Sequence, residues 1–493
     1  MKKNAVMALV LIGIALAGNL IAYKMFHVPR QTEMIVLFVL AVAYPILRNP
    51  LFGVYAVFLL LPFVNYARRL YYLVYMRPGI DPLLMTGEVL LALIMAGLFF
   101  ELRERGEKDR EIKLFRLMVF MYFCYMAMRV FVYTEVPLDQ AAAAFKFYGP
   151  AVLFFFVGCI YGLHFRHVRI IWGITTLIGV LAALYGIKQL YFGYSEAEKI
   201  WLSSIKFSTL VIFDIVRPFS FFSSPATFGD YLLLAVIGVL MLWHWENQIF
   251  RMLSLIVLPV LFCAVLITSV RSNWIGFVLV MVLWFAFTRV KGAKKRIMVL
   301  VAIAALYFAG QAVSDMFAGE SAPVALQPAE AATSSERYMQ LLVTSRSTAI
   351  TDPMQEHSFL SRIALWQYMI RLSTDPQMAL LGRGLGGLNA DSLYITYLAE
   401  FGYPGMLFII FILGAFVFRG LKIIDTAQSP DVVALARGIT VMNMVFAIVS
   451  ITGSHIHAFP GDVYFWFFNG VLVKLPQLDA WLATKSAPAA EGA

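Results

Sequence analysis

The residues best suited to chemistry gather near the C-terminus, in residues 382–405, with the sequence GRGLGGLNADSLYITYLAEFGYPG. This segment combines Arg383, Asp391 and Glu400 with several glycines, which allow backbone turns that other residues resist. It closes a long polar stretch and runs directly into an apolar one, so these charged groups are expected at a membrane surface. A lipid-linked substrate presents its head group there.

The composition indicates the fold class that positions these residues. The chain of 493 residues is 61% hydrophobic and 14% charged, with many apolar runs close to the length of a membrane span. Only helices or closed barrels satisfy the backbone in lipid, and the alternating pattern of a barrel is absent. We therefore predict an all-α, polytopic helical membrane protein, one integral-membrane domain over residues 1–493 with about 12–14 transmembrane helices. The candidate spans are 5–23, 33–48, 51–64, 82–100, 115–133, 147–163, 170–190, 228–243, 252–270, 273–288, 297–313, 402–418, 437–452 and 460–475.

Basic loops predict the orientation. If the spans alternate, the most basic connections fall on one side, which is cytoplasmic by the positive-inside rule. Both termini are then cytoplasmic, in an inner membrane, and residues 314–401 form one large loop outside. Residues 319–335 and the tail 486–493 have compositions typical of disorder.

Arginines in the predicted external segments oppose this topological rule. The fixed fork of guanidinium donors suits a diphosphate better than the point charge of lysine does. The alternative is that they pair with nearby carboxylates or reach lipid phosphates. The net charge of +10 is mostly the topological signal and does not predict nucleic-acid binding. The external set comprises Arg68, Arg69, Arg77, Arg217, Arg271, Arg337, Arg346, Arg362, Arg371 and Arg383.

Missing motifs exclude several chemistries. The sequence has no GxxxxGK phosphate loop, no strand-associated GxGxxG, no HExxH and no Asp-x-Asp pair. We therefore expect no nucleotide hydrolysis, no metal and no cofactor, and the substrate itself must bring the energy for any reaction.

Three segments together resemble the superfamily of O-antigen ligases and O-antigen polymerases of bacterial surface polysaccharide assembly. The first is RPFSFFSSPATFG, from Arg217, and the second is TSVRSNWIG, which contains Arg271. The third runs from Ser361-Arg362 through the glycines near 384 to Tyr394, Glu400 and Gly405. They occur in the expected order within residues 217–420, while the N-terminal half resembles the family only in hydropathy.

The resemblance implies a GT-C-like inverting glycosyltransferase without a metal, acting on the outer face of the inner membrane. Its donor would be an undecaprenyl-diphosphate-linked glycan, and its acceptor a glycan that is lipid-linked or attached to lipid A core. A polymerase lengthens the lipid-linked chain, a ligase transfers it to lipid A core, and a third relative transfers glycans to protein. A chain-length regulator and a flippase are possible partners, beside membrane lipid.

The matched positions nominate site residues. Arg217 and Arg271 fit the role of stabilising the diphosphate leaving group, with Arg362 as a third candidate. A helix starting near Arg362, with Trp366 and Met369 on one face, is expected to lie along the membrane and frame a cavity or, alternatively, only to pack. Asp391 stands where ligases carry a His-Asn pair. It can accept the acceptor hydroxyl's proton if burial favours its protonated form, or orient the acceptor sugar.

Other residues are candidates for substrate binding, each with a structural alternative. Glu400 either meets substrate or caps the following helix. His455 and His457 lie in a predicted external turn and offer alternative bases, or cap helix ends. Arg383 and Tyr394 complete this set.

A transporter for a glycan or other solute is the competing class. Charges inside the membrane mark transport paths, yet Arg129, Lys188 and Asp230 fall near the ends of the predicted spans. No internal repeat is evident either, and the polar residues concentrate in one loop, so we favour an enzyme.

Overall fold

A computed structural model describes residues 43–75, 83, 86–102, 109–132, 135–204, 210–212, 215–245, 248–289, 357–387 and 390–486. The chain divides into two compact units. The first comprises the described residues within Met1–Lys113, Gly193–Thr209 and Phe221–Ser223, and the second comprises those within Leu114–Phe192, Leu210–Ser220 and Ser224–Ala493.

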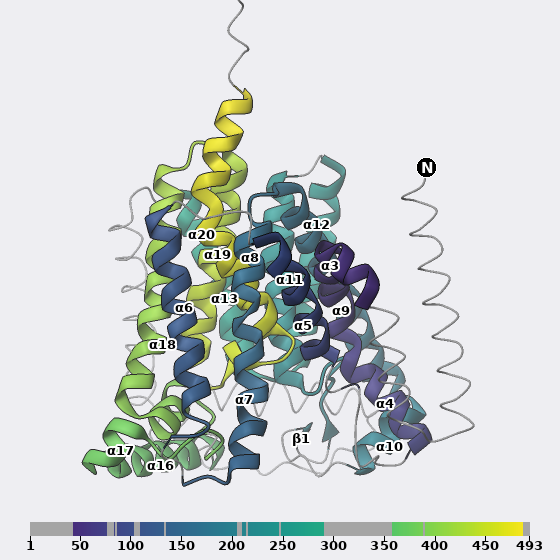
Figure 1. The fold of residues 1–493 in the computed structure, drawn as a ribbon. Coiled ribbons are helices and arrows are strands. Elements are labelled where there is room, and N and C mark those ends of the chain that lie inside the picture. The colour runs from purple at the N-terminus through teal and green to yellow at the C-terminus, as the bar shows by residue number, and fades with distance from the viewer. Residues whose placement is uncertain are drawn as a thin grey trace, which may run out of the picture. The chain divides into compact units, whose positions relative to one another are not determined.

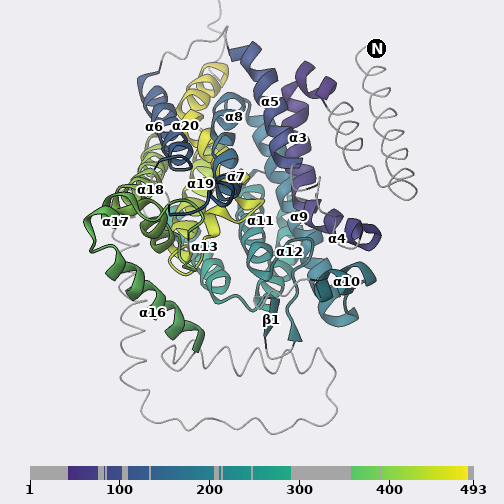
Figure 2. The ribbon, with the colours of Figure 1, turned by 60° about the horizontal axis from the view of Figure 1, so that its bottom comes forward.

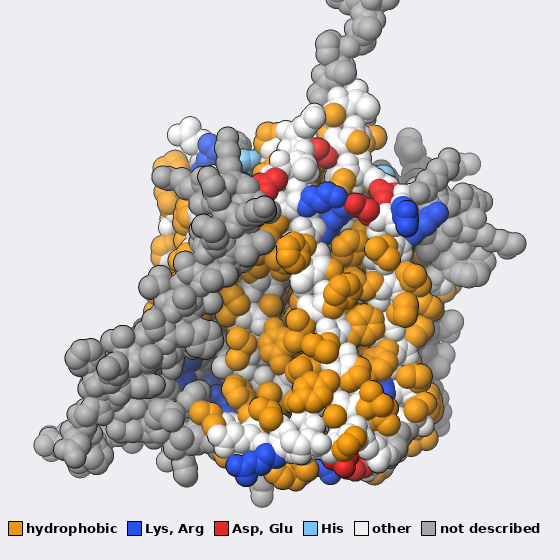
Figure 3. All heavy atoms as spheres, turned by 90° about the vertical axis from the view of Figure 1, so that its left-hand side faces the viewer, with side chains coloured by type: hydrophobic (Ala, Val, Ile, Leu, Met, Phe, Trp, Pro, Cys, Tyr) orange, Lys and Arg blue, Asp and Glu red, His pale blue; other side chains and the backbone are white. Residues whose placement is uncertain are grey.

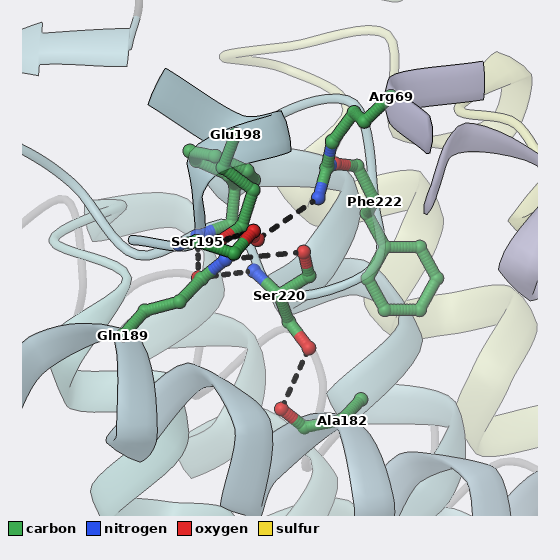
Figure 4. Close-up of polar contacts among 8 residues, drawn as sticks. Arg69, Ala182, Gln189, Ser195, Glu198, Ser220 and Phe222 are labelled. Atoms are coloured by element: carbon green, nitrogen blue, oxygen red, sulfur yellow. Dashed lines mark hydrogen bonds and ion pairs between the residues drawn. The ribbon is translucent and has the colours of Figure 1, made fainter. Parts of the chain in front are cut away.

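The first unit contains four α-helices and one 3-10 turn. These are α3 (Pro50–Leu60), η1 (Leu61–Phe63), α4 (Val64–Tyr75), α5 (Thr86–Leu102) and α10 (Glu196–Ser204). Inside this unit Arg69 is fully buried, and Figure 4 shows it directed at Glu198 and at the carbonyl of Phe222. Its Nη1 lies 3.5 Å from Glu198 Oε1, and its guanidinium lies 5.0 Å from the ring centre of Trp201. Arg69, one of the predicted external arginines, therefore ties three segments of this unit together.

The second unit holds the remaining helices and a minimal hairpin (Figures 1 and 2). Strands β1 (Val211–Ile212) and β2 (Ile215–Val216) pair antiparallel, with Val211 opposite Val216. The helices are α6 (Arg110–Met128, counted here from Leu114), α7 (Leu138–Val152), α8 (Phe154–Tyr161), α9 (Phe165–Phe192), α11 (Pro225–Trp245), α12 (Gln248–Ile267), α13 (Arg271–Arg289), α16 (His357–Leu372), α17 (Pro376–Leu381), α18 (Leu393–Thr426), α19 (Pro430–Val449), η5 (His455–His457) and α20 (Gly461–Ser486).

Seven of the described helices are long and apolar enough to cross a membrane. Figure 3 shows hydrophobic side chains over the middle of the face formed by α6 and α18, with charged side chains at both rims. On α18, Leu407 and Phe411 are 58% and 63% exposed, as lipid-facing residues are in the absence of a bilayer. The multi-pass helical membrane character is confirmed. A total near fourteen stays a prediction, because expected spans 5–23 and 297–313 and most of 33–48 lie outside the described residues.

Several helix boundaries differ from the hydropathy prediction: α19, for example, begins at Pro430 where 437 was expected, and α20 continues to Ser486 where 475 was expected. A span expected at 147–163 is part of a longer candidate, Leu138–Tyr161, whose polar first turns include Asp139 and Gln140 and lower its local hydropathy. The span expected at 402–418 belongs to α18, which begins at Leu393 and is interrupted at Gly402, where φ is 69°. The predicted helix near Arg362 is present as α16, and its Met369 is buried. The predicted mobile residues 319–335 and all but the first residue of the tail 486–493 fall outside the described residues.

Glycine packing joins α8 to α20 within the core. A Cβ atom at Gly158 would collide with the carbonyl of Phe467, and one at Gly470 with the carbonyl of Phe155. The two backbones therefore approach each other more closely than any side chain permits, as small residues allow in membrane helix pairs.

We expect Gly470→Ala to destabilise the protein by at least about 1–3 kcal/mol, because the backbones must separate to admit the methyl group. The measurement is the unfolding midpoint in detergent. Gly173→Ala on α9 is the matched control, since no atom lies within 4 Å of the new methyl group and the midpoint should hold or rise. Equal midpoints for the two variants would contradict this account of the α8–α20 pair.

Candidate functional site

The glycine-rich loop is described over residues 382–387 and 390–392, and its start folds back onto the first turns of α18. Its glycines Gly382, Gly384 and Gly386 have φ values of 63°, 107° and 78°, which side chains with a Cβ resist. The amides of Arg383 and Gly384 donate to the carbonyls of Ala399 (2.7 Å) and Glu400 (3.1 Å). The loop is thus held by backbone hydrogen bonds that only this glycine pattern permits.

Glu400 anchors the same loop from inside. Its side chain is buried, and Oε1 accepts a 2.8 Å hydrogen bond from the amide of Gly386. The structural alternative for Glu400 was that it caps the following helix. Its carboxyl group instead accepts from an amide of the loop that precedes α18. Oε2 is buried and has no hydrogen-bond partner among the described residues.

Arg129 is a structural arginine whose role the sequence did not disclose. It is 1% exposed, and its guanidinium donates to the carbonyls of Val132 (2.6 Å), Leu381 (2.5 Å) and Glu400 (3.3 Å). It therefore fixes the start of the glycine-rich loop to both α6 and α18. A lone arginine at the end of an apolar stretch was the available signal, but two of its three partners, Leu381 and Glu400, lie 252 and 271 residues away.

Two predicted site residues, Arg362 and Asp391, lie together. Arg362 Nε is 3.4 Å from Asp391 Oδ2, and the two side chains are 30% and 60% exposed. Asp391 has a φ of 47°, a left-handed conformation that is unusual outside glycine and suggests a local functional constraint. Trp366 of α16 donates from Nε1 to the carbonyl of Ala390 at 2.9 Å, so α16 packs directly against this position.

A second contact joins the segments that carry the other two predicted arginines. Arg217 Nη1 donates to the carbonyl of Ser269 at 3.3 Å, two residues before Arg271 begins α13. Figure 4 shows how the chain just after Arg217 is braced. Gln189 Oε1 accepts from the amide of Ser220 at 2.7 Å, and Ser220 Oγ donates to the carbonyl of Ala182 at 2.8 Å.

Asn273 connects these arginines to α11. It donates from Nδ2 to the carbonyl of Ala226 at 3.1 Å, and it fills the space that a Cβ atom at Gly229 would need. The two segments that carry Arg217 and Arg271 are therefore fitted to each other by a glycine and an asparagine.

The next turn of α11 carries a buried aspartate, Asp230, which contacts the buried His455 of η5. His455 Nδ1 lies 2.7 Å from Asp230 Oδ1, with exposures of 5% and 2%. In the segment that leads to His455, the carbonyls of Ser450 (2.9 Å) and Gly453 (3.1 Å) both accept a hydrogen bond from the amide of Leu393. Because Leu393 is two residues from Asp391, this segment links α11 to the Arg362–Asp391 pair.

His457 belongs to a separate buried aromatic group. Its Nε2 lies 2.7 Å from the hydroxyl of Tyr397, which is hydrogen-bonded in turn to the hydroxyl of Tyr122. The centre of the Tyr148 ring lies 4.6 Å from the centre of the His457 ring. Burial lowers the pKa of His457 to about 4, so the ring is neutral near pH 7.

The half-buried His457 gives a prediction for how stability changes with pH. Its pKa is about 4 when folded and near 6.5 when unfolded, so between these values the unfolded state binds more protons. We expect the free energy of unfolding to fall as the pH drops from 6.5 towards 4, by at most about 3 kcal/mol from this group. Unfolding midpoints in detergent between pH 7.5 and 4.5 measure it. His457→Gln should flatten the slope, whereas the same change at exposed His164 should not, and identical slopes for the two variants would refute the assignment.

The last two predicted binding residues have structural partners. Tyr394 donates to the carbonyl of Ala447 at 2.7 Å. Arg383 forms a half-exposed ion pair with Glu135 at 2.9 Å, and the amide of Glu135 donates to the carbonyl of Arg383. The structure thus favours the structural alternative for these two, while Arg217, Arg271, Arg362 and Asp391 remain at the solvent-accessible or half-buried positions of the site.

The candidate site therefore runs through one continuous set of contacts inside the second unit. It passes from Arg217 and Arg271 over Asn273 to α11, through Asp230 and His455, and across Leu393 to Asp391 and Arg362. Within the part of the chain that the structure describes, no group of three or more His, Cys, Asp or Glu side chains could hold a metal ion. No protein-family model matches the chain, and no curated protein matches it either.

Proposed function

We propose that the protein is a metal-independent inverting glycosyltransferase of the multi-pass membrane class. It joins oligosaccharide repeat units from undecaprenyl diphosphate into exopolysaccharide or O-antigen on the outer face of the inner membrane. One observation carries this proposal: Arg217 contacts the loop that begins the helix of Arg271. The Arg217 side chain therefore contacts the backbone two residues before Arg271, and this contact joins the two segments that most resemble the O-antigen ligase and polymerase superfamily.

The proposed glycosyl transfer requires positively charged donors beside the diphosphate leaving group. The acceptor hydroxyl attacks the anomeric carbon, the bond from that carbon to the diphosphate oxygen breaks, and the diphosphate leaves with the electron pair. Negative charge grows on that diphosphate in the transition state. Preorganised arginine donors stabilise it without a metal, and their fork geometry matches phosphate oxygens.

Arg362 and Asp391 supply the acceptor side in this proposal. Asp391 was expected to serve as the base only if it were buried. Its side chain is 60% exposed and paired with Arg362, so this condition is not met. We assign Asp391 to hydrogen bonding with acceptor hydroxyls, in an orientation fixed by Arg362. The left-handed backbone at Asp391, a conformation that few residues other than glycine, Asn and Asp adopt, supports this assignment.

The test uses purified protein in liposomes with an undecaprenyl-diphosphate oligosaccharide of one repeat. We expect lipid-linked chains of two or more repeats, resolved by mass. A glycan moved to lipid A core or to a protein would support the ligase readings instead. Unaltered substrate that only changes leaflet would support transport and overturn the enzyme proposal.

A further inference from the structure

The Asp230–His455 pair is the strongest feature that the proposed function does not use. Both side chains are buried, and Nδ1 to Oδ1 is 2.7 Å. A carboxylate can only accept, so Asp230 holds the proton on Nδ1 and leaves Nε2 with a lone pair. This is the arrangement by which an acidic residue prepares an imidazole to take a proton from a hydroxyl.

The second nitrogen of His455 is not used by the fold. Nε2 is buried and has no hydrogen-bond partner among the described residues. A histidine that serves only to join two helices would normally have both nitrogens satisfied, because burying an unpaired polar atom costs about 1–3 kcal/mol. The free edge of the ring faces Gly453, where an added Cβ atom would lie 2.6 Å from Nε2.

Other unpaired polar atoms lie on the segments around His455. Asn273 Oδ1 and Ser450 Oγ are both buried without partners among the described residues. Asn273 lies in the first turn of α13, two residues after Arg271, and packs on Gly229 of α11, the neighbour of Asp230. The carbonyl of Ser450 accepts the amide of Leu393. Acceptors and donors left open between the arginines and Asp391 suit a ligand rich in hydroxyl groups.

We propose that His455 is the general base of the reaction and that Asp230 is its positioning residue, an inference that rests on the proposed glycosyltransferase function. The acceptor hydroxyl gives its proton to His455 Nε2 as its oxygen bonds to the anomeric carbon. The carbon–oxygen bond to the diphosphate breaks in the same step. Asp230 stabilises the imidazolium, which then releases the proton to water.

The experiment measures kcat and KM for chain extension with a defined lipid-diphosphate oligosaccharide. We expect His455→Gln and Asp230→Asn each to lower kcat by roughly 10²–10⁴-fold with KM little changed. Asp230→Glu should regain part of the rate, because it restores a carboxylate. Tyr231→Phe is the matched control, since it removes a buried hydrogen bond to Tyr464 from the neighbouring residue of α11 and should leave kcat unchanged.

A second measurement guards against a folding defect. His455→Ala leaves a space of the ring's size, and free imidazole should restore activity to it in a dose-dependent manner while leaving His455→Gln unaffected. Wild-type kcat in folded His455→Gln or Asp230→Asn, or no rescue of folded His455→Ala, would overturn the assignment of the base alone. If wild-type protein makes no longer chains from any lipid-diphosphate donor, the glycosyltransferase proposal fails and this assignment falls with it.

Discussion

Replacement of either Arg217 or Arg271 by lysine is expected to abolish chain extension, with kcat reduced by at least about 10²–10³-fold. Lysine keeps the positive charge but loses the planar fork that contacts two phosphate oxygens together. Arg217 also donates to the carbonyl of Ser269, so its position depends on the geometry of a guanidinium. Product ladders from the liposome assay give the rate, and circular dichroism gives the helical content, which should not change.

Arg383→Lys is the control for this pair of substitutions. Arg383 lies in the same unit and in the glycine-rich loop, but its guanidinium is engaged with Glu135. Exposed ion pairs contribute little, below about 1 kcal/mol, so this variant should extend chains at close to the wild-type rate. Full activity in both Arg217→Lys and Arg271→Lys would remove these residues from the proposed diphosphate site.

Arg129→Met is expected to have the largest effect on stability, about 3–5 kcal/mol, and to release the glycine-rich loop. The change leaves the carbonyls of Val132, Leu381 and Glu400 without their donor in a buried place. Removal of one member of a buried charged network typically costs this much. The unfolding midpoint in detergent measures the first effect, and the rate of limited proteolysis within residues 382–392 measures the second.

Arg383→Met is the matched comparison, because it removes an arginine that belongs to the same loop and whose half-exposed side chain pairs with Glu135. Its midpoint should stay near that of the wild type. An Arg129→Met protein that unfolds at the wild-type temperature would show that the backbone alone holds the loop.

Hydropathy predicted the long helices of the second unit because their apolar runs are close to the length of a membrane span. It misplaced the starts of α7 and α18, where polar residues such as Asp139 and Glu400 are buried or lie at a helix start. The helical nature of residues 357–372 followed from the spacing of Trp366 and Met369. Local periodicity therefore carries most of the fold.

The sequence predicted which residues belong to the candidate site but not which of them contact one another. Arginines against the topological rule led to Arg217, Arg271 and Arg362, and the left-over acidic residue in the glycine-rich segment led to Asp391. The contacts join residues that are far apart in the sequence. Arg362 and Asp391 are 29 positions apart, Asp230 and His455 are 225 apart, and Arg129 lies 271 positions from Glu400, whose backbone carbonyl it contacts. No local pattern encodes such contacts, since they arise only when the helices pack.

The interruption of α18 at Gly402 divides this helix into a first part that contacts the glycine-rich loop and a second part that carries exposed apolar side chains. A Cβ atom at this glycine would lie 2.5 Å from the carbonyl of Ala379, so the break is built into the packing of α17. Before the break, the carbonyl of Glu400 is bonded to Arg129, and after it α18 carries exposed side chains such as Leu407 and Phe411. A change in the apolar length of α18 after Gly402 can therefore leave the contacts of the glycine-rich loop before it in place.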